Sequence, residues 1–311
     1  MFETSHTKNS GTVHLFPAFV PEYSGFETQV IESYGVDLRT YLTKASEATG
    51  EDLTDYNIIS NNFLDNQLRS QYIAYIISCC ASDILNDKKL RPDYVASYSM
   101  GIYAAMYHSG SVDFITGLNM IKTAFNLIEK NLPEKAMSMC AIGGLSLDDI
   151  NELLLPYPSD VFNINRNSEF SFLLSGRREH LEHIMNRAIS IGAMQTRMLP
   201  VAHPYHSPLL KAASLEFNNA LLHMKIGENT LKYVSSINQI IVQERKDIIA
   251  ELTNNIYQHF DWYSTFTFFL NNGMRTFIEC GAGDSLYRMG KFIEGDFSIY
   301  NLKNLKKYAK Q

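Results

Sequence analysis

The chain has 311 residues, of which 45% are hydrophobic and 19% charged, a balance typical of a globular protein with a sizeable core. Its 27 Lys and Arg against 33 Asp and Glu give a net charge of −6, which argues against broad nucleic-acid binding because such binding needs a basic face. Residues 72–81 form the longest apolar stretch, too short to cross a bilayer, and the N-terminus lacks a signal-peptide pattern. We therefore expect a cytoplasmic protein with no membrane or nucleic-acid partner.

The first part of the chain alternates short β-type runs with longer helical patterns. Strands are predicted at 12–16 and 94–99, and helices at 61–85, from residue 100 onward, and at 114–130. Cys79 and Cys80 lie in the first of these helices, and no C-x-x-C pair occurs, so we interpret all four cysteines as reduced core residues. A metal site or a catalytic cysteine is the alternative. The alternation predicts a mainly parallel sheet covered by helices.

The middle of the chain has a different order of elements. A strand at 135–144, a helix at 146–155 capped by Ser146, two strands joined by a polar turn around 167–168, a second helix and a last strand follow one another. This β-α-β-β-α-β order predicts a ferredoxin-like α+β subdomain over residues 132–198. Residues 1–131 and 199–311 would form the large α/β subdomain, with further helices at 207–224 and 261–273 and a strand, glycine turn and helix start at 275–286.

The segment "YVASYSMGIYAA" (94–105) has the pattern of a nucleophile elbow. A strand leads to Ser99, Gly101 follows two residues later, and a helical pattern begins at once. Such a turn exposes the serine Oγ, and the next backbone N–H helps to hold an oxyanion. The first glycine of the usual G-x-S-x-G is replaced by Ser97, which is small enough to be tolerated. A strand–Ser–Gly–helix junction without catalytic meaning is the alternative.

A nucleophilic serine needs a base, and the segment "PVAHPYHSPLL" (200–210) offers two histidines. His203 and His206 lie in a strand-to-helix loop that prolines stiffen, which suits a fixed general base. His180 and His183 are spaced i, i+3 on a charged helix, but no third ligand lies nearby in the sequence. We therefore expect no metal site.

Five segments, in order, resemble the malonyl-CoA:acyl-carrier-protein acyltransferase family, which includes acyltransferase domains of fatty acid and polyketide synthases. Residues 93–114 resemble the segment around its G-H-S-L-G-E motif, 161–176 its N-x-N-S-P-x-Q stretch, 202–208 its H-A-F-H-S motif and 277–286 its E-x-G-P-G-x-x-L motif. The segment "LFPAFVPEY" keeps only Phe16 and Pro17 of the family's F-P-G-Q-G-S-Q. The resemblance implies a hydrolase-like α/β domain with a ferredoxin-like insertion.

The resemblance also implies roles for single residues. Ser99 would be the nucleophile and His206 the base, oriented by a backbone carbonyl from residues 256–262, which points to Gln258. The backbone N–H groups of Met100 and Phe19 would hold the oxyanion. The substrate pocket would be lined by Gln71, Tyr98, Ala124, Asn167, Ser171, His203 and Tyr205.

Departures from the family pattern concern the group that holds a malonyl carboxylate. The family's clamp arginine is replaced by Ala124, the histidine before the nucleophile by Tyr98, and the glutamine of N-x-N-S-P-x-Q by Ser171. Burying a carboxylate without a partner would cost several kcal/mol, so we expect an uncharged acyl group. The alternative is that Lys122 or Arg166 replaces the missing arginine.

The sequence therefore predicts an acyltransferase that works through an acyl-Ser99 intermediate on coenzyme A and acyl-carrier-protein thioesters. No tightly bound cofactor is implied, the partner would be an acyl carrier protein, and family members that stand alone are often monomers. Four alternatives remain: an acyl hydrolase of carrier proteins, a malonyl transacylase with a relocated clamp, a non-catalytic carrier-protein-binding subunit, and an unrelated serine esterase.

Overall fold

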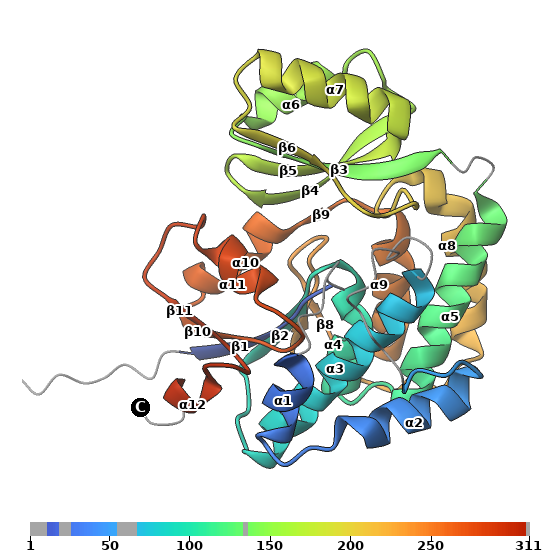
Figure 1. Cartoon of the computed structure of the whole chain (residues 1–311), viewed down its shortest axis with the longest axis vertical. Coiled ribbons are helices and arrows are strands. Elements are labelled where there is room, and N and C mark those ends of the chain that lie inside the picture. Colours follow the sequence, from blue (N-terminus) through green and yellow to red (C-terminus); the bar gives the residue numbers. More distant parts are fainter. Residues whose placement is uncertain (1–10, 19–25, 55–66, 133–135, 309–311) are drawn as a thin grey trace, which may run out of the picture.

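The computed structural model describes residues 11–18, 26–54, 67–132 and 136–308, which form a large part and a smaller part (Figure 1). The large part is built on a six-stranded sheet, and the smaller part carries a five-stranded sheet of its own. No helix in the described ranges is long and apolar enough to cross a membrane. All four cysteines are buried and free of disulfides.

The large sheet has the strand order β11-β10-β1-β2-β7-β8, and its neighbouring strands are parallel except at the antiparallel β7/β8 edge. The strands are β1 (Gly11–Phe16), β2 (Tyr94–Ser97), β7 (Tyr233–Val234), β8 (Ile241–Val242), β10 (Met274–Glu279) and β11 (Ser298–Asn301). The sheet is mainly parallel, as the sequence predicted, because strand and helix alternate along the chain.

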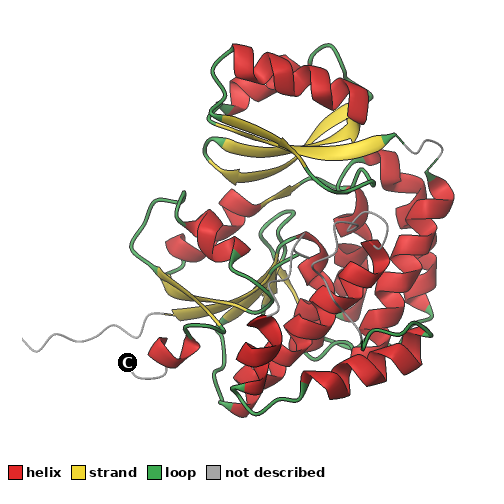
Figure 2. Cartoon of the chain, viewed as in Figure 1, coloured by secondary structure: helices red, strands yellow, loops and turns green. Residues whose placement is uncertain are grey.

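Helices cover both faces of this sheet (Figure 2). They are α1 (Phe26–Glu32), α2 (Leu38–Thr49), α3 (Gln67–Asp87), η2 (Ser99–Gly101), α4 (Ile102–His108), α5 (Phe114–Asn131), η3 (Pro208–Leu210), α8 (Lys211–Leu222), α9 (Arg245–Tyr257), α10 (Trp262–Asn271), α11 (Ser285–Gly290) and α12 (Leu305–Tyr308). Successive β1 side chains face opposite sides: Val13 and Leu15 pack with α10 and α11, and Phe16 packs in the core with α3 and α4.

The smaller sheet has the order β6-β3-β5-β4-β9, and its first four strands follow the antiparallel order of a ferredoxin-like unit. Its elements are β3 (Met137–Gly143), α6 (Leu147–Leu154), β4 (Val161–Ser168), β5 (Ser171–Arg177), α7 (Arg178–Ser190), β6 (Gln195–Met198) and β9 (Phe260–Asp261). Helices α6 and α7 lie together on its outer face (Figure 1). Ser146 caps α6, as predicted, and shares a capping box with Asp149.

Two differences between the predicted and observed elements concern the smaller sheet, and several elements of the large part, among them α2, β7, β8, α9 and β11, were not predicted. The turn between β4 and β5 lies at residues 169–170 rather than 167–168, because the strand pairing continues to Ser168. The strand β9 was not predicted, because two residues carry no strand pattern of their own and become a strand only by pairing with Asn165 and Arg166 of β4. This parallel pair connects the smaller sheet to the segment that leads into α10.

Candidate active site

Ser99 lies in the sharp turn between β2 and α4, in a backbone conformation that non-glycine residues rarely adopt. Its φ is +52°, in the left-handed region. The one-turn helix η2 begins at Ser99 and passes directly into α4. Gly101 is required there, since a Cβ at this position would lie 2.1 Å from the Phe16 carbonyl oxygen. The chain therefore makes a nucleophile elbow at the place where the sequence predicted one.

The residue that replaces the first glycine of the motif is fixed by hydrogen bonds. Ser97 Oγ lies 2.8 Å from the hydroxyl of Tyr233, and Ser236 Oγ donates to the Ser97 carbonyl oxygen at 2.7 Å. Both Ser97 and Tyr233 are buried. A serine is thus accommodated here because β7 and the following loop provide it with polar partners.

The imidazole of His206 reaches the nucleophile. Its Nε2 lies 2.6 Å from Ser99 Oγ, and its own φ is +59°. The His206 backbone N–H donates to the Ile256 carbonyl at 2.8 Å, which places the residue at the C-terminal end of α9. The negative end of the helix dipole favours a positive charge at this position.

The environment of His206 keeps the ring neutral before reaction. Burial lowers the pKa of His206 to about 3, and the backbone of Asn255 partly opposes this shift. The Phe260 ring contributes to the burial, with its centroid 4.5 Å from that of the imidazole. A neutral ring can accept the serine proton.

Gln258, predicted to orient the base through its carbonyl, makes no hydrogen bond with His206, whose Nδ1 has no hydrogen-bond partner among the described residues. The Gln258 side chain donates to the Tyr257 hydroxyl at 3.1 Å, and its backbone N–H closes the end of α9. The backbone of Asn255 acts on the pKa of His206, and its Nδ2 donates to the Ser99 carbonyl at 3.4 Å. Because α9 continues to Tyr257, Asn255 lies in its last turn and Gln258 at its C-cap, and the orienting role of Gln258 stays a prediction.

Ser99 and His206 open into a cleft of about 570 Å³. Its apolar lining includes Ala18, Tyr98, Met139, Leu173, Leu199, Pro200, Val201, Tyr205 and Phe260. Its charged lining comprises Glu27, Arg197, Asp284, Arg288 and Lys303. The apolar side chains of Met139 and Leu173 come from the smaller sheet, whereas most of the charged groups come from the large part. The cleft therefore lies between the two sheets, with the nucleophile on the large one.

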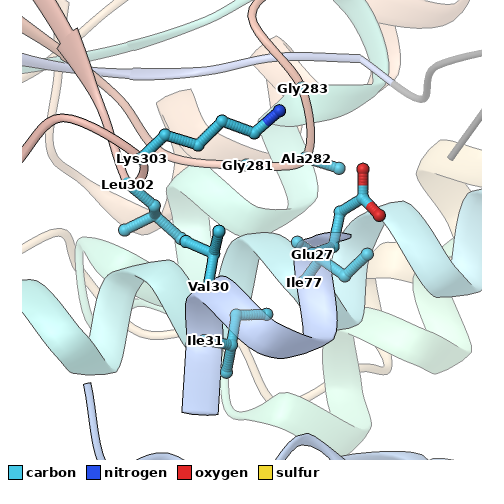
Figure 3. A pocket seen from close by; sticks show the side chains of 9 residues that line it. All are labelled: Glu27, Val30, Ile31, Ile77, Gly281, Ala282, Gly283, Leu302 and Lys303. Carbon is cyan, nitrogen blue, oxygen red and sulfur yellow. The ribbon is translucent and has the colours of Figure 1, made fainter. Parts of the chain in front are cut away.

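A small cavity adjoins this cleft and shares three of its lining residues, Glu27, Gly283 and Lys303. In Figure 3 the Lys303 side chain runs beside the loop of residues 281–283, while Glu27 rises from the first turn of α1. Glu27 is buried and Lys303 is exposed. The cavity has room for about one water molecule, so the 570 Å³ cleft is the space that can take a substrate.

Tyr98, directly before the nucleophile, is held by two asparagines. Its hydroxyl donates to Asn167 Oδ1 at 2.8 Å and accepts from Asn165 Nδ2 at 2.9 Å. Its ring contacts those of Phe260 and Trp262 edge-on. With its hydroxyl engaged in this way, Tyr98 presents an uncharged aromatic surface to the cleft.

Ala124 lines a separate small cavity with Gln71, Met100 and Tyr205. Neither cation that could replace a missing arginine is directed there. Lys122 Nζ donates to the Thr49 carbonyl at 3.0 Å, and the Arg166 guanidinium lies over the Tyr263 ring at 4.6 Å. No charged residue is among those that line the cavity beside Ala124 in the described part of the chain.

The remaining predicted site residues fall into three groups: three pocket residues, a fourth pocket residue, and Phe19, the predicted oxyanion donor. Gln71, His203 and Tyr205 belong to one hydrogen-bonded chain, with Gln71 Nε2 3.1 Å from the Tyr205 hydroxyl and that hydroxyl 3.4 Å from His203 Nδ1. Ser171 does not line the cleft; it begins β5 opposite Gly143, and Leu173 reaches the cleft instead. Phe19 lies outside the described residues. Sequence reasoning missed Asn165 and Asn255, although both fall inside or beside motifs that it had singled out.

No metal site accompanies these residues: within the described ranges, no group of three or more His, Cys, Asp or Glu side chains could hold a metal ion.

Comparison with known proteins connects this geometry to one group of enzymes. No family model matches the chain. Over 221 residues, which are 70% of this chain and 72% of the relative, it is 22% identical to a malonyl CoA-acyl carrier protein transacylase of Staphylococcus aureus. Over 206 residues, 65% of this chain and 69% of the relative, it is 27% identical to the polyketide biosynthesis malonyl CoA-acyl carrier protein transacylase BaeC of Bacillus velezensis.

Solved structures have the same fold. A malonyl-transacylase in complex with a type II polyketide synthase acyl-carrier protein superposes with a TM-score of 0.87 at 21% identity. The match covers 96% of this chain and 100% of that one. The α/β architecture with a second, antiparallel sheet is therefore shared over nearly the whole length.

Proposed function

We propose that this chain is a member of the malonyl-CoA:acyl-carrier-protein transacylase family and that it transfers uncharged acyl groups between thioesters through an ester on Ser99. The observation that carries the proposal is the 2.6 Å contact between Ser99 Oγ and His206 Nε2 in the lining of a 570 Å³ cleft. The left-handed backbone of Ser99 supports it, because strained conformations of this kind gather at functional sites.

In the first half-reaction, Ser99 Oγ attacks the carbonyl carbon of the thioester while His206 Nε2 takes the serine proton. The oxyanion binds the Met100 N–H at the start of η2, together with the N–H of Phe19 as the second proposed donor. The intermediate collapses as the carbon–sulfur bond breaks. His206 gives the proton to the leaving sulfur, so a free thiol departs and the acyl-Ser99 ester remains.

In the second half-reaction, a thiol sulfur attacks the ester carbonyl and loses its proton to His206. The Ser99 oxygen leaves and recovers that proton, which regenerates the enzyme and forms a new thioester. Water in place of the thiol would release a free acid by the same steps. We favour transfer, with coenzyme A and the phosphopantetheine arm of an acyl carrier protein as the two thiols; the solved complex of a related fold with a carrier protein supports that partner.

The cleft supports a thioester of this kind at its charged side. Arg197, Arg288 and Lys303 are exposed cations among its lining residues, and Arg288 is paired with Asp284 at 3.0 Å. Guanidinium and ammonium groups are the usual partners of phosphate, which both coenzyme A and phosphopantetheine carry. We propose that these cations receive the phosphate end, while the acyl end reaches Ser99.

An uncharged acyl group is favoured by the surroundings of Ala124 and Tyr98. The side chains of Lys122 and Arg166 are engaged elsewhere, so neither supports the relocated clamp that a malonyl carboxylate would need. A carboxylate placed beside Ala124 would lose its hydration without gaining a charged partner.

The test is covalent labelling with radiolabelled acetyl-, butyryl- and malonyl-coenzyme A, quenched in acid and read on a denaturing gel. We expect label from the two neutral donors, none on Ser99→Ala, and wild-type label on Ser190→Ala, a control at the exposed end of α7. Malonyl label stronger than acetyl or butyryl label would overturn the preference for an uncharged group.

The fate of the acyl group separates the remaining functions. Adding a carrier protein with its phosphopantetheine arm should move the label onto that protein. Free acid formed at the same rate with and without the acceptor would instead identify a hydrolase. A chain that gives neither label nor free acid from any donor, yet still binds the carrier protein, would be a non-catalytic subunit.

A further inference from the structure

We propose that the preferred acyl group carries a small neutral hydrogen-bond donor, a hydroxyl, and that Gln71 Oε1 accepts a hydrogen bond from it. This inference rests on the proposed function and specifies its substrate. It follows from a chain of four polar side chains, Glu129–His203–Tyr205–Gln71, which we call the polar chain. The chain begins at the protein surface and ends beside the cavity next to Ala124.

The outer end of the polar chain fixes the direction of its hydrogen bonds. The Glu129 side chain is 52% exposed, and its carboxylate accepts hydrogen bonds but cannot donate one. His203 is buried with its Nε2 against Glu129 Oε1, so the ring proton is on Nε2. In the neutral ring the opposite nitrogen, Nδ1, is an acceptor, and the directions of the following bonds hold for that form.

Each following group is oriented by the one before it. The Tyr205 hydroxyl donates to His203 Nδ1 at 3.4 Å, so its oxygen must accept the next bond. Gln71 supplies that bond through Nε2 at 3.1 Å. The Gln71 amide is thereby held in one of its two possible orientations, with the carbonyl oxygen Oε1 left over.

That oxygen is an unused acceptor in the interior. Gln71 is only 3% exposed, and its Oε1 makes no hydrogen bond within the described residues. Buried acceptors of this kind are rare because they lose their hydration without compensation, so each one needs an explanation. We assign the missing donor to a ligand, because Met100, the residue after Ser99, lines the same cavities as Gln71, and Tyr205 lines both one of them and the 570 Å³ cleft. A water molecule is the other occupant of that size, and a comparison of acyl donors distinguishes the two.

The size of the space selects a small group. Gln71 lines two cavities next to the nucleophile turn, and each has room for about one water molecule. Met100, which follows Ser99, lines both cavities. The small side chain of Ala124 on α5 lines one of them. A hydroxyl is about the size of a water molecule, so it fits where a carboxylate or a further carbon chain would not.

The chemistry excludes the other common acyl substituents. A malonyl carboxylate or a β-keto oxygen would only accept, and would face the Gln71 carbonyl oxygen. An ammonium group would donate but would bring an unpaired charge into an interior with no carboxylate among the cavity's lining residues. A neutral hydroxyl alone satisfies both polarity and size.

The experiment compares three coenzyme A thioesters with the same four-carbon chain: butyryl, 3-hydroxybutyryl and acetoacetyl. At the third carbon, butyryl has no hydrogen-bonding group, 3-hydroxybutyryl has a hydroxyl and acetoacetyl has a ketone. We expect the initial rate of acyl-Ser99 formation at low donor concentration to be about tenfold higher for 3-hydroxybutyryl than for butyryl, and lowest for acetoacetyl. Equal rates for butyryl and 3-hydroxybutyryl would overturn the inference, as would a preference for acetoacetyl.

Two variants assign the preference to the polar chain. Gln71→Met keeps the shape but removes the acceptor, so 3-hydroxybutyryl should lose its advantage over butyryl. Glu129→Gln keeps the size of the surface side chain but introduces an amide that can donate a hydrogen bond to His203. The hydrogen bonds of the polar chain can then run in the opposite direction. The ratio of the acylation rate with 3-hydroxybutyryl to that with acetoacetyl should therefore fall severalfold. Glu182→Gln, exposed on α7, is the matched control and should keep the wild-type ratio.

The outcomes separate this inference from the proposed function. Absence of label from all three donors would overturn both. Label from butyryl and 3-hydroxybutyryl at equal rates would leave the acyl-Ser99 mechanism intact and overturn only the assignment of Gln71. A preference for 3-hydroxybutyryl that survives in Glu129→Gln and in folded Gln71→Met would also overturn that assignment.

Discussion

His206 combines a geometry that suits a base with a burial that suppresses its charge. The ring lies against Phe260, and burial lowers its pKa to about 3, far below the ordinary value near 6.5. In the proposed mechanism, the C-terminal end of α9 favours the imidazolium that forms when His206 takes the serine proton. The residue is therefore in its active, neutral form over a wider acidic range than an exposed histidine would be.

This burial predicts an unusual pH dependence. A base with its ordinary pKa near 6.5 would lose roughly tenfold in kcat/KM between pH 8 and pH 5.5, because most of it would be protonated. With the pKa of His206 lowered to about 3, we expect kcat/KM for a neutral acyl donor to change less than twofold over this interval. Acylation rates with folding checked by circular dichroism at each pH would measure it. A fall that follows a single group with a pKa near 6.5 would contradict the burial of the base.

At the scale of elements, the junction of β2 and α4 holds the nucleophile through close backbone packing. The Tyr98 N–H donates to the Phe16 carbonyl at 2.8 Å, so the turn is fastened to the end of β1. Gly101 faces the same carbonyl oxygen, at a distance that leaves no space for a side chain. Two adjacent parallel strands therefore determine where Ser99 Oγ lies.

The close approach of Gly101 to the Phe16 carbonyl predicts that Gly101→Ala lowers activity, although the substitution adds only a methyl group. A Cβ 2.1 Å from the Phe16 oxygen must displace the turn, so we expect a loss of at least about 100-fold in Ser99 acylation. A lower thermal midpoint should accompany it. Gly227→Ala is the matched control, since a Cβ there meets nothing nearer than 3.7 Å and its φ is not positive. Acylation of Gly101→Ala at the rate of the Gly227→Ala variant would show that the turn has room to adjust.

At the scale of the whole molecule, a buried histidine pair connects the central sheet to the helices that pack on it. His14 Nδ1 on β1 lies 2.9 Å from His108 Nε2 at the end of α4, and His108 Nδ1 lies 2.8 Å from Ser82 Oγ on α3. Burial lowers the pKa of His108 to about 4, and burial together with the His108 charge lowers the pKa of His14 well below 6.5. The strand β1 and the helices α3 and α4 are therefore joined by hydrogen bonds of two histidines that are neutral in the folded state.

The pair predicts a contribution to acid lability. Between pH 6.5 and about 4, His108 binds a proton in the unfolded chain but stays neutral in the folded chain. The free energy of unfolding therefore falls as the pH drops through this window. His108 alone should account for roughly 2 kcal/mol of the loss between pH 7 and pH 5. Urea unfolding at both pH values should show that the free energy of unfolding of His108→Gln falls by about 2 kcal/mol less than that of wild type. His223→Gln, at an exposed position, should show the wild-type loss, and an equal loss in His108→Gln would contradict the assignment.

Much of the architecture could be predicted from local pattern. The alternation of strand and helix, the β-α-β-β-α-β order and the cap at Ser146 all follow from periodicity and capping chemistry within short windows. The pairing of Ser99 with His206 came from motif order, and the structure places their side chains 2.6 Å apart. That Ala124 and Tyr98 stand where the family has charged side chains stays a prediction.

What the sequence by itself determined, then, is which residues could react and where the strands and helices that carry them run, because those properties depend on residue type and on near neighbours. Only the tertiary structure decided that Ser99 Oγ and His206 Nε2 meet, that β9 joins the smaller sheet, and that Glu129, His203, Tyr205 and Gln71 form one polar chain. Each depends on contacts between residues far apart in sequence, and on the direction in which side chains and carbonyls leave their helices. No local pattern encodes those directions, since they are set by how the two sheets and their helices pack together.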